Sequence, residues 1–210
     1  AENFSYAGGC TGYLQSGMQP KTKLQEKLHR VFHQYGFEDI ETPTFEYFEV
    51  FSKEVGTIPS RELYKFFDRE GNTLVLRPDF TPSVSRACAT YFNPEKEVVS
   101  LCYTGNTFIN NSSFRGRLKE TTQMGVERMG DDSPEADAEI LAMTVECLLA
   151  TGLTEFQVSV GQVDYYKAIF AQTGLSQEEE EELRELISQK NYFGVEELVK
   201  NKNMDKSLAR

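Results

Sequence analysis

The sequence predicts an α+β fold in which helices interleave with antiparallel strands and an all-helical segment follows. The 210 residues are 39% hydrophobic and 26% charged, a composition typical of a globular domain with a buried core. Helical and strand-like periodicities alternate up to about residue 162, and only helical spacing follows. The sequence contains no run of about 20 apolar residues and no basic–apolar leader, so we expect no membrane span and no secretion signal.

The first predicted element is an amphipathic helix that begins at Pro20. Before it, residues 1–19 combine three glycines with scattered aromatics and no period, which predicts an irregular segment. From Pro20 onward, apolar residues recur at steps of three and four, and Gly36 is predicted to end the helix. The next residues are predicted to be extended, because Thr42 precedes Pro43 and is pushed away from helical angles.

The middle of the chain is predicted to carry most of the strands. Glycine in Glu70-Gly71-Asn72 supplies the positive φ of a hairpin turn between two strand-like runs. The elements predicted here are strands at 63–68 and 73–76, a helix at 82–92, strands at 98–108 and 121–129, and a polar loop, NNSSFRGRLKE, between the last two.

The remaining elements are mostly helical. Ser133-Pro134 and the neighbouring aspartates are predicted to open a helix that runs to about Ala150. A strand is expected at 156–160, followed by helices at 163–172, 176–189 and 192–201. The predicted organisation is an irregular segment at 1–19, an α+β core at 20–162 and a helical segment at 163–210.

The charge distribution argues against a general nucleic-acid-binding surface. The chain has 22 basic and 33 acidic side chains and a net charge of −11, which repels phosphate. Basic residues outnumber acidic ones only in the middle third, residues 58–130, so an anionic small molecule is best accommodated there. The acidic run at 178–182 is spread around a helix and is interpreted as a solvated first turn with Ser176 as its cap.

The histidines and cysteines do not suggest a metal centre. His29 and His33 have the four-residue spacing of a metal pair, but no third ligand is evident in the sequence, so we interpret them as flanking positions of the helix and expect no metal. The four cysteines (Cys10, Cys88, Cys102, Cys147) form no CxxC pair, which indicates free thiols in a reducing cytoplasm.

Several enzyme classes lack their characteristic motifs. The sequence has neither of the glycine-rich loops GxGxxG and GxxxxGK[ST], and a serine or cysteine hydrolase would need a histidine base in a recognisable motif. We therefore expect no nucleotide cofactor of the standard folds, and no cofactor at all.

A candidate small-molecule site lies in the middle third. In LRPDFTP the spacing predicts that Asp79 and Thr81 point together, and in QMGVE it places Gln123 and Glu127 on one strand face. Carboxylates with hydroxyl and amide groups suit a cationic or zwitterionic ligand such as an amino acid. Basic side chains at 115, 117 and 119 could hold its carboxylate or a phosphate. A polar sheet face exposed to water explains the same spacing equally well.

Together these motifs resemble a known family. The helix at 20–35 with Pro43 resembles motif 1 of class II aminoacyl-tRNA synthetases, the dimer-forming segment. The segments LRPDFT, CYTGNTF and GRLKETTQMGVERMG are similar to the histidyl-tRNA synthetase core and still closer to its paralogues, the regulatory subunits of ATP phosphoribosyltransferase. The resemblance covers roughly residues 20–165 and implies a class II synthetase-like antiparallel sheet flanked by helices.

The resemblance also assigns expected roles in a histidine pocket. Asp79 stands where the synthetase has a carboxylate for the α-ammonium group, and Thr81 would assist it. Gln123 and Glu127 match the polar residues of the motif 2 return strand, and Arg117 matches the basic residue of the motif 2 loop. The histidine-binding candidates are therefore Asp79, Thr81, Arg117, Gln123 and Glu127, with no catalytic residue.

One departure from the synthetase pattern indicates lost catalysis. After its phenylalanine, motif 2 of a working synthetase continues with Arg-x-Glu, and the arginine grips the ATP α-phosphate. This chain has Ile109 after Phe108, and isoleucine cannot donate a hydrogen bond to a phosphate. The segment Gly-x-Arg-Asp before the first helix and the second histidine motif with paired tyrosines are not recognisable, so we expect an N-terminal fragment of a longer subunit.

The resemblance therefore implies a non-catalytic regulatory subunit of ATP phosphoribosyltransferase in histidine biosynthesis. It implies a short catalytic subunit as partner, histidine as feedback ligand, and a cytoplasmic homodimer formed through residues 20–45 within a hetero-oligomer, without tRNA or membrane. Two alternatives stay open: a divergent or degenerate histidyl-tRNA synthetase core, and an interaction module whose pocket binds nothing.

Overall fold

The structure, a computed structural model, describes residues 10–12, 15–52, 58–111 and 117–201. The chain divides into two compact units, residues 1–156 and 157–210, which we describe separately. Among the described helices, none combines the length and the apolar character that a membrane crossing requires.

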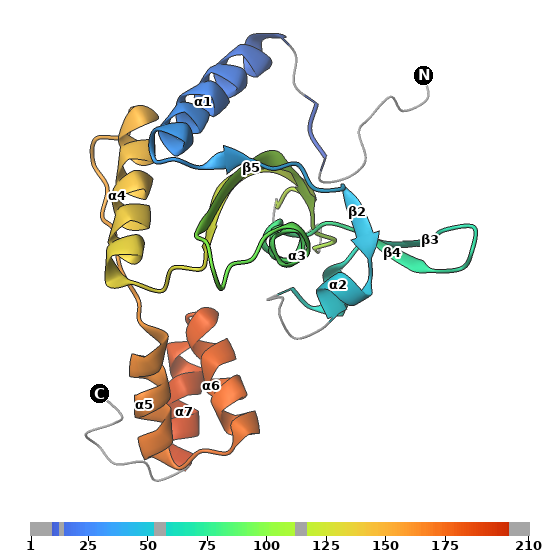
Figure 1. Cartoon of the computed structure of the whole chain (residues 1–210). Coiled ribbons are helices and arrows are strands. Elements are labelled where there is room, and N and C mark those ends of the chain that lie inside the picture. Colours follow the sequence, from blue (N-terminus) through green and yellow to red (C-terminus); the bar gives the residue numbers. More distant parts are fainter. Residues whose placement is uncertain (1–9, 13–14, 53–57, 112–116, 202–210) are drawn as a thin grey trace. The chain divides into compact units, whose positions relative to one another are not determined.

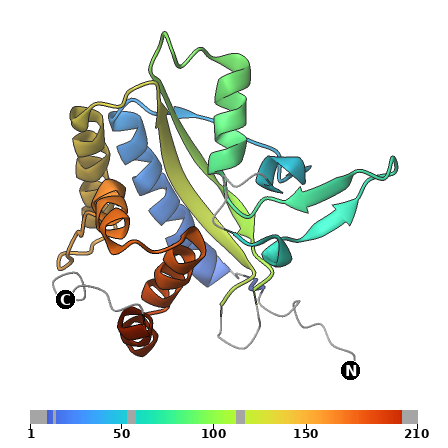
Figure 2. The same ribbon diagram turned by 90° about the horizontal axis from the view of Figure 1, so that it is seen from below.

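The first unit is built around a long antiparallel strand pair. β5 (Val99–Phe108) pairs with β6 (Glu120–Met129) over its whole length, and the short β1 (Glu38–Asp39) adds to β5 in parallel. Helices α1 (Gln15–Gln34) and α4 (Pro134–Ala150) cover one face of this sheet, and α3 (Thr81–Tyr91) covers the other (Figure 1, Figure 2).

Alternation along β5 creates two separate hydrophobic cores. Val99, Leu101 and Tyr103 point to the α3 face, where they pack against the buried side chains of that helix. Cys102 points to the opposite face and packs with Phe32 of α1 and other side chains of α1 and α4. Adjacent residues of one strand therefore serve different layers, as the period of two requires.

A smaller antiparallel sheet lies beside the first. Its strand order is β2 (Phe45–Tyr47), β4 (Thr73–Leu76), β3 (Lys65–Phe67), and β3 and β4 form the predicted hairpin. Gly71 takes a φ of 87° in the turn, as the sequence predicts. The short helices α2 (Glu49–Ser52) and η1 (Ser60–Glu62) flank this sheet. Its core is the cluster of Phe51, Leu63 and Val75.

Arg77 joins the two sheets. Its buried guanidinium donates from Nε to the Asn106 carbonyl of β5 at 2.8 Å and from Nη1 to the Thr42 carbonyl at 2.8 Å. Its backbone accepts from Phe108 N at 3.0 Å and donates to Thr44 O at 2.9 Å. One residue thus satisfies carbonyls on segments that are far apart in the sequence.

Up to residue 201, where the described part of the chain ends, the second unit contains three helices: α5 (Val163–Thr173), α6 (Gln177–Ser188) and α7 (Tyr192–Asn201). Among the residues whose burial is described, each helix contributes one buried apolar side chain: Phe170, Leu183 and Leu198. Ser176 caps α6 in a capping box with Glu179, so the acidic run forms the first turn of a helix, as interpreted from the sequence. The three helices lie within a residue or two of their predicted bounds.

Two predicted details are wrong. The first helix begins at Gln15 rather than Pro20, and Pro20 lies inside it. The proline lacks one backbone donor and its ring crowds the carbonyl four residues before it, yet a helical turn forms upstream of it. Residues 156–160 form no strand, and Val158 and Val160 are exposed. Apolar residues alternate in this segment, but no strand in the described chain pairs with it.

We expect Arg77→Met to destabilise the first unit by about 2–4 kcal/mol, because it leaves the buried carbonyl of Thr42 and the partly buried carbonyl of Asn106 without their donor. Urea denaturation followed by circular dichroism measures the loss. Arg69→Met, at an exposed arginine of the hairpin turn, is the matched control and should change stability little. Equal stability of the two variants would contradict the joining role of Arg77.

Candidate functional site

A hydrogen bond between α3 and β6 forms the centre of the candidate site. Thr81, the first residue of α3, donates from Oγ1 to Oε1 of Glu127 at 2.6 Å. Glu127 is half-buried, and its pairing with Leu101 of β5, whose side chain packs against α3, places it on the face of β6 toward that helix. The hydrogen bond connects residues 46 positions apart, so the contact is tertiary rather than local.

Asp79 lies close enough to Glu127 for their charges to interact. Burial raises the pKa of Glu127, and the nearby negative charge of Asp79 raises it further, while the hydrogen bond from Thr81 opposes the rise. Asp79 itself accepts from the backbone N–H of Phe80 at 2.7 Å, which orients its carboxylate at the start of α3. Two carboxylates therefore share one partly buried place.

Tyr103 completes the group and was not predicted from the sequence. It pairs with Gly125 across β5 and β6, and its Oη accepts from Gln123 Nε2 at 3.5 Å. Burial, followed by the charge of Glu127, raises the pKa of Tyr103 to about 12, so the phenol stays protonated. A signal was present in the sequence: Gly125 leaves room for the ring, since a Cβ there would lie 2.4 Å from Tyr103 Oη.

The structure thus brings together four of the five predicted residues: Asp79, Thr81, Gln123 and Glu127. The reason given from the sequence was wrong in part. β4 ends at Leu76, so Asp79 and Thr81 are not alternating strand residues, and their proximity comes from the turn that leads into α3.

The basic residues of the motif 2-like loop are less well placed for a ligand. Arg117 is exposed, and no hydrogen bond or ion pair recorded for the described residues includes it. Arg115 lies outside the described residues. The backbone N–H of Ile109 donates to the carbonyl of Lys119 at 2.9 Å, so the two chain segments stay paired one residue beyond the end of β5. Ile109 is half-buried there and offers no side-chain donor.

The chemistry of this site favours a cation. Within the described chain, no ion pair joins Asp79 or Glu127 to a basic side chain, although the negative charge of Asp79 disfavours a second charge on Glu127 and raises its pKa. An ammonium group placed between the two carboxylates would relieve that repulsion, and it could also donate a hydrogen bond to the hydroxyl oxygen of Thr81.

Other features lie on the opposite face of the sheet. A cavity of about 560 Å³ between α1 and β6 is lined mainly by Lys21, Leu24 and Leu28 of the helix and by Thr122 and Met124 of the strand. Further along α1, His29 and His33 contact Asp39. The sequence alone gave no sign that Asp39 lies beside them. Neither feature includes the Thr81–Glu127 pair.

Comparison with known proteins identifies the family. The family model described as histidyl-tRNA synthetase matches residues 9–210. The chain belongs to the histidyl-tRNA synthetase family. The match is wider than residues 20–165, on which the sequence resemblance rested, and it includes the helical segment.

Relatives within this family carry a regulatory name. The chain is 41% identical to an ATP phosphoribosyltransferase regulatory subunit of Acetivibrio thermocellus, over 95% of this chain and 48% of the relative. It is 39% identical to a regulatory subunit of the same name from Ruminiclostridium cellulolyticum, over 90% of this chain and 45% of the relative. The resemblance to regulatory subunits is therefore confirmed, and the chain spans about half the length of these relatives.

Solved structures confirm the class II synthetase-like fold. A Bacillus halodurans protein described as an ATP phosphoribosyltransferase regulatory subunit/histidyl-tRNA synthetase superposes with a TM-score of 0.88 at 31% identity, covering 98% of this chain and 53% of that chain. A histidine–tRNA ligase subunit of Alicyclobacillus acidocaldarius, 22% identical, has a TM-score of 0.80, covers 95% of this chain and 58% of that chain, and shares the fold.

We expect Gly125→Ala to destabilise the first unit by about 1–3 kcal/mol, because the new methyl group overlaps the Tyr103 ring. The cost should shrink in a Tyr103→Leu background, which removes the overlapping atoms. A double-mutant cycle measured by urea denaturation reports this coupling. Additive effects would show that the glycine is required for another reason. Gly36→Ala, where no atom lies within 4 Å but φ is +80°, controls for backbone strain alone.

Proposed function

We propose that this chain is part of a non-catalytic regulatory subunit of ATP phosphoribosyltransferase. In this proposal the subunit acts in histidine biosynthesis, in the cytoplasm, and is required for the activity of a short catalytic subunit. It also carries histidine feedback. The names of the relatives support the regulatory role, and the four free cysteines agree with a reducing compartment.

The group formed by Asp79, Thr81 and Glu127 carries the proposal of histidine as ligand. An amino acid brings an α-ammonium group, which the two carboxylates and the hydroxyl can accept in a partly buried place. Gln123, whose Nε2 donates to Tyr103 Oη, adds an amide donor and acceptor to this group. Arg117, in the loop before β6, is proposed to approach the ligand carboxylate, since its guanidinium is exposed and has the opposite charge.

The absence of catalysis is proposed from Ile109. Adenylate formation develops negative charge on a phosphate, and a guanidinium at the position after Phe108 stabilises that charge in the synthetases that this motif resembles. Ile109 contributes only an aliphatic side chain there. A ligand site without this group can bind an amino acid and transmit the binding, but it cannot activate the amino acid with ATP in that way.

Self-association is part of the proposal. The small sheet carries exposed aromatic side chains on its two outer strands: Phe45 (51% exposed) and Tyr47 (52%) on β2, and Phe66 (36%) on β3. The rings of Phe45 and Phe66 lie 5.7 Å apart, while Phe67 (72%), next to Phe66 in the strand, points to the opposite face. Aromatic residues exposed together are typical of protein interfaces. This surface adjoins the segment 20–45, so we propose that a homodimer forms here and that the dimer enters a hetero-oligomer.

We expect the full-length protein that contains this chain to raise phosphoribosyl transfer by the short catalytic subunit, and histidine to suppress the reaction of the complex. Mixing the two purified subunits and following the product from ATP and phosphoribosyl pyrophosphate measures both effects. The full-length protein alone should give no histidine-dependent pyrophosphate exchange. Exchange in that control would favour the alternative, a divergent histidyl-tRNA synthetase, and no gain in transfer would reject the regulatory role.

We expect histidine affinity to fall as pH falls, beginning at a higher pH than for an ordinary glutamate. An ammonium ligand prefers ionised Glu127, whose pKa is raised, so binding weakens as the pH decreases through that raised pKa. Glu127→Gln should lower affinity roughly 10- to 100-fold and flatten this part of the profile.

Calorimetry with the full-length protein measures the affinities, and comparison with Glu127→Gln removes the ligand's own titration. Glu70→Gln, in the exposed hairpin turn, is the matched control and should bind as the wild type does. Wild-type affinity in Glu127→Gln would place the ligand elsewhere. No binding to the intact wild type would leave the pocket as an interaction surface only.

A further inference from the structure

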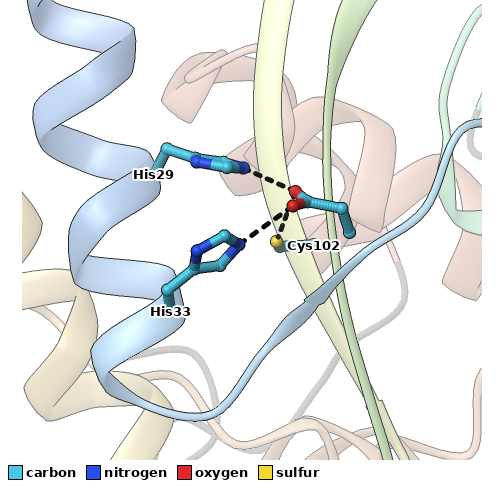
Figure 3. Close-up of side chains that lie close together, drawn as sticks. His29, His33 and Cys102 are labelled. Atoms are coloured by element: carbon cyan, nitrogen blue, oxygen red, sulfur yellow. Dashed lines mark hydrogen bonds and ion pairs between the residues drawn. The ribbon is translucent and has the colours of Figure 1, made fainter.

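The strongest feature outside the proposed ligand site is a group of four potential metal ligands. His29, His33, Asp39 and Cys102 each offer one ligand atom, and these atoms all lie within 4.8 Å of one another (Figure 3). The side chains of His29, His33 and Asp39 are 39%, 46% and 58% exposed, while Cys102 is buried. An ion can therefore enter from solvent and reach a buried sulfur.

The fold brings these residues together in a defined way. His29 and His33 are one turn apart on α1, so both rings project from one face, with centroids 4.2 Å apart. Gly36 ends the helix with φ of 80° and turns the chain into β1. The parallel pairing of β1 with β5 then places Asp39 directly beside Cys102.

The contacts already centre on one carboxylate. Asp39 Oδ1 lies 2.5 Å from His29 Nε2, Oδ2 lies 3.0 Å from His33 Nε2, and Cys102 Sγ donates to Oδ1 at 3.4 Å. With bonds of about 2.0–2.3 Å, the ligand atoms of a tetrahedral zinc site lie about 3.4 Å apart. The four atoms therefore need only small side-chain rotations to surround an ion.

From this convergence we propose that His29, His33, Asp39 and Cys102 form a binding site for Zn²⁺. Two imidazoles, a carboxylate and a thiolate are the ligand types that zinc takes in proteins, and four of them fill a closed tetrahedral shell. The charges of the carboxylate and the thiolate balance the charge of the ion. When the ion binds, Cys102 Sγ forms the metal–sulfur bond and its proton leaves to solvent.

The site holds α1, β1 and β5 at one point. Its ligands come from a helix, the strand that follows it and a central strand some 60 residues later, and Phe32 and Phe37 pack beside Cys102 in the same core. Four ligands from the chain leave no open position, so the ion is structural rather than catalytic. It would fix the entry of the chain into the sheet that carries the proposed ligand site on its other face.

Metal-free protein, prepared with a chelator and checked by elemental analysis, tests the site. Addition of Co²⁺ as a zinc substitute should produce a thiolate-to-cobalt charge-transfer band and the intense visible bands of tetrahedral cobalt. Calorimetry should give one Zn²⁺ per chain, and saturating Zn²⁺ should raise the melting temperature. Mg²⁺ should not compete, because it prefers octahedral oxygen ligands.

The double variant His29→Gln/His33→Gln should lose more than about 100-fold in Zn²⁺ affinity, since even an outer-sphere partner is commonly worth 10–100-fold. Cys102→Ser should abolish the charge-transfer band. Cys147→Ser, at a half-buried thiol of the same core outside the cluster, is the matched control and should keep the band. Circular dichroism confirms that each variant folds.

The contrary results are as clear. If Co²⁺ gives no charge-transfer band with the folded wild type, or Zn²⁺ binds the double histidine variant with wild-type affinity, the site does not exist. In that case the two histidines serve only as hydrogen-bond partners that orient Asp39. Because Cys102 is fully buried, the exposed histidine pair keeps the proposal testable even where Cys102→Ser fails to fold.

Discussion

The arrangement of the first unit depends on a single buried guanidinium. Arg77 stands where the small sheet ends, and its hydrogen bonds reach the chain before β2 and the carbonyl of Asn106 in β5. A buried charge without acceptors would be costly, so these carbonyls and the arginine fix one another. The turn from Arg77 into α3 is thereby set, and with it the position of Asp79 and Thr81 above β6.

From Arg77 a stack of flat groups leads to the proposed ligand site. The guanidinium lies 4.1 Å from the Phe80 ring centroid, and that ring stacks on Tyr103 at 4.3 Å and 11°. Two glycines make room for the stack: a Cβ at Gly105 would lie 2.5 Å from the guanidinium, and Gly125 lies under Tyr103. The site is therefore held by packing as well as by its own hydrogen bonds.

Sequence reasoning was most successful where periodicity and turn residues act locally. The hairpin at Gly71, β5, β6, the helix after Ser133 and the three helices described in the second unit follow from such signals. The resemblance assigned Thr81 and Glu127 to the same pocket, and the structure shows the hydrogen bond between them. It failed where contacts between distant segments decide: Tyr103 joins the site through strand register, and Asp39 and Cys102 join the histidine pair through the β1–β5 pairing. The strand expected at 156–160 failed for the same reason, since a strand needs a partner.

Strand β5 connects the two proposed sites by its geometry. Cys102 and Tyr103 are neighbours in the sequence, but alternation sends the first to the α1 face and the second to the α3 face. A shift of β5 along its axis would disturb both groups, because each takes its register from this strand. β1 fixes β5 from one side and β6 from the other. The cluster of His29, His33, Asp39 and Cys102 links α1 and β1 to β5. By holding β5 in register it also preserves the position of Tyr103, although no side chain is common to the two sites.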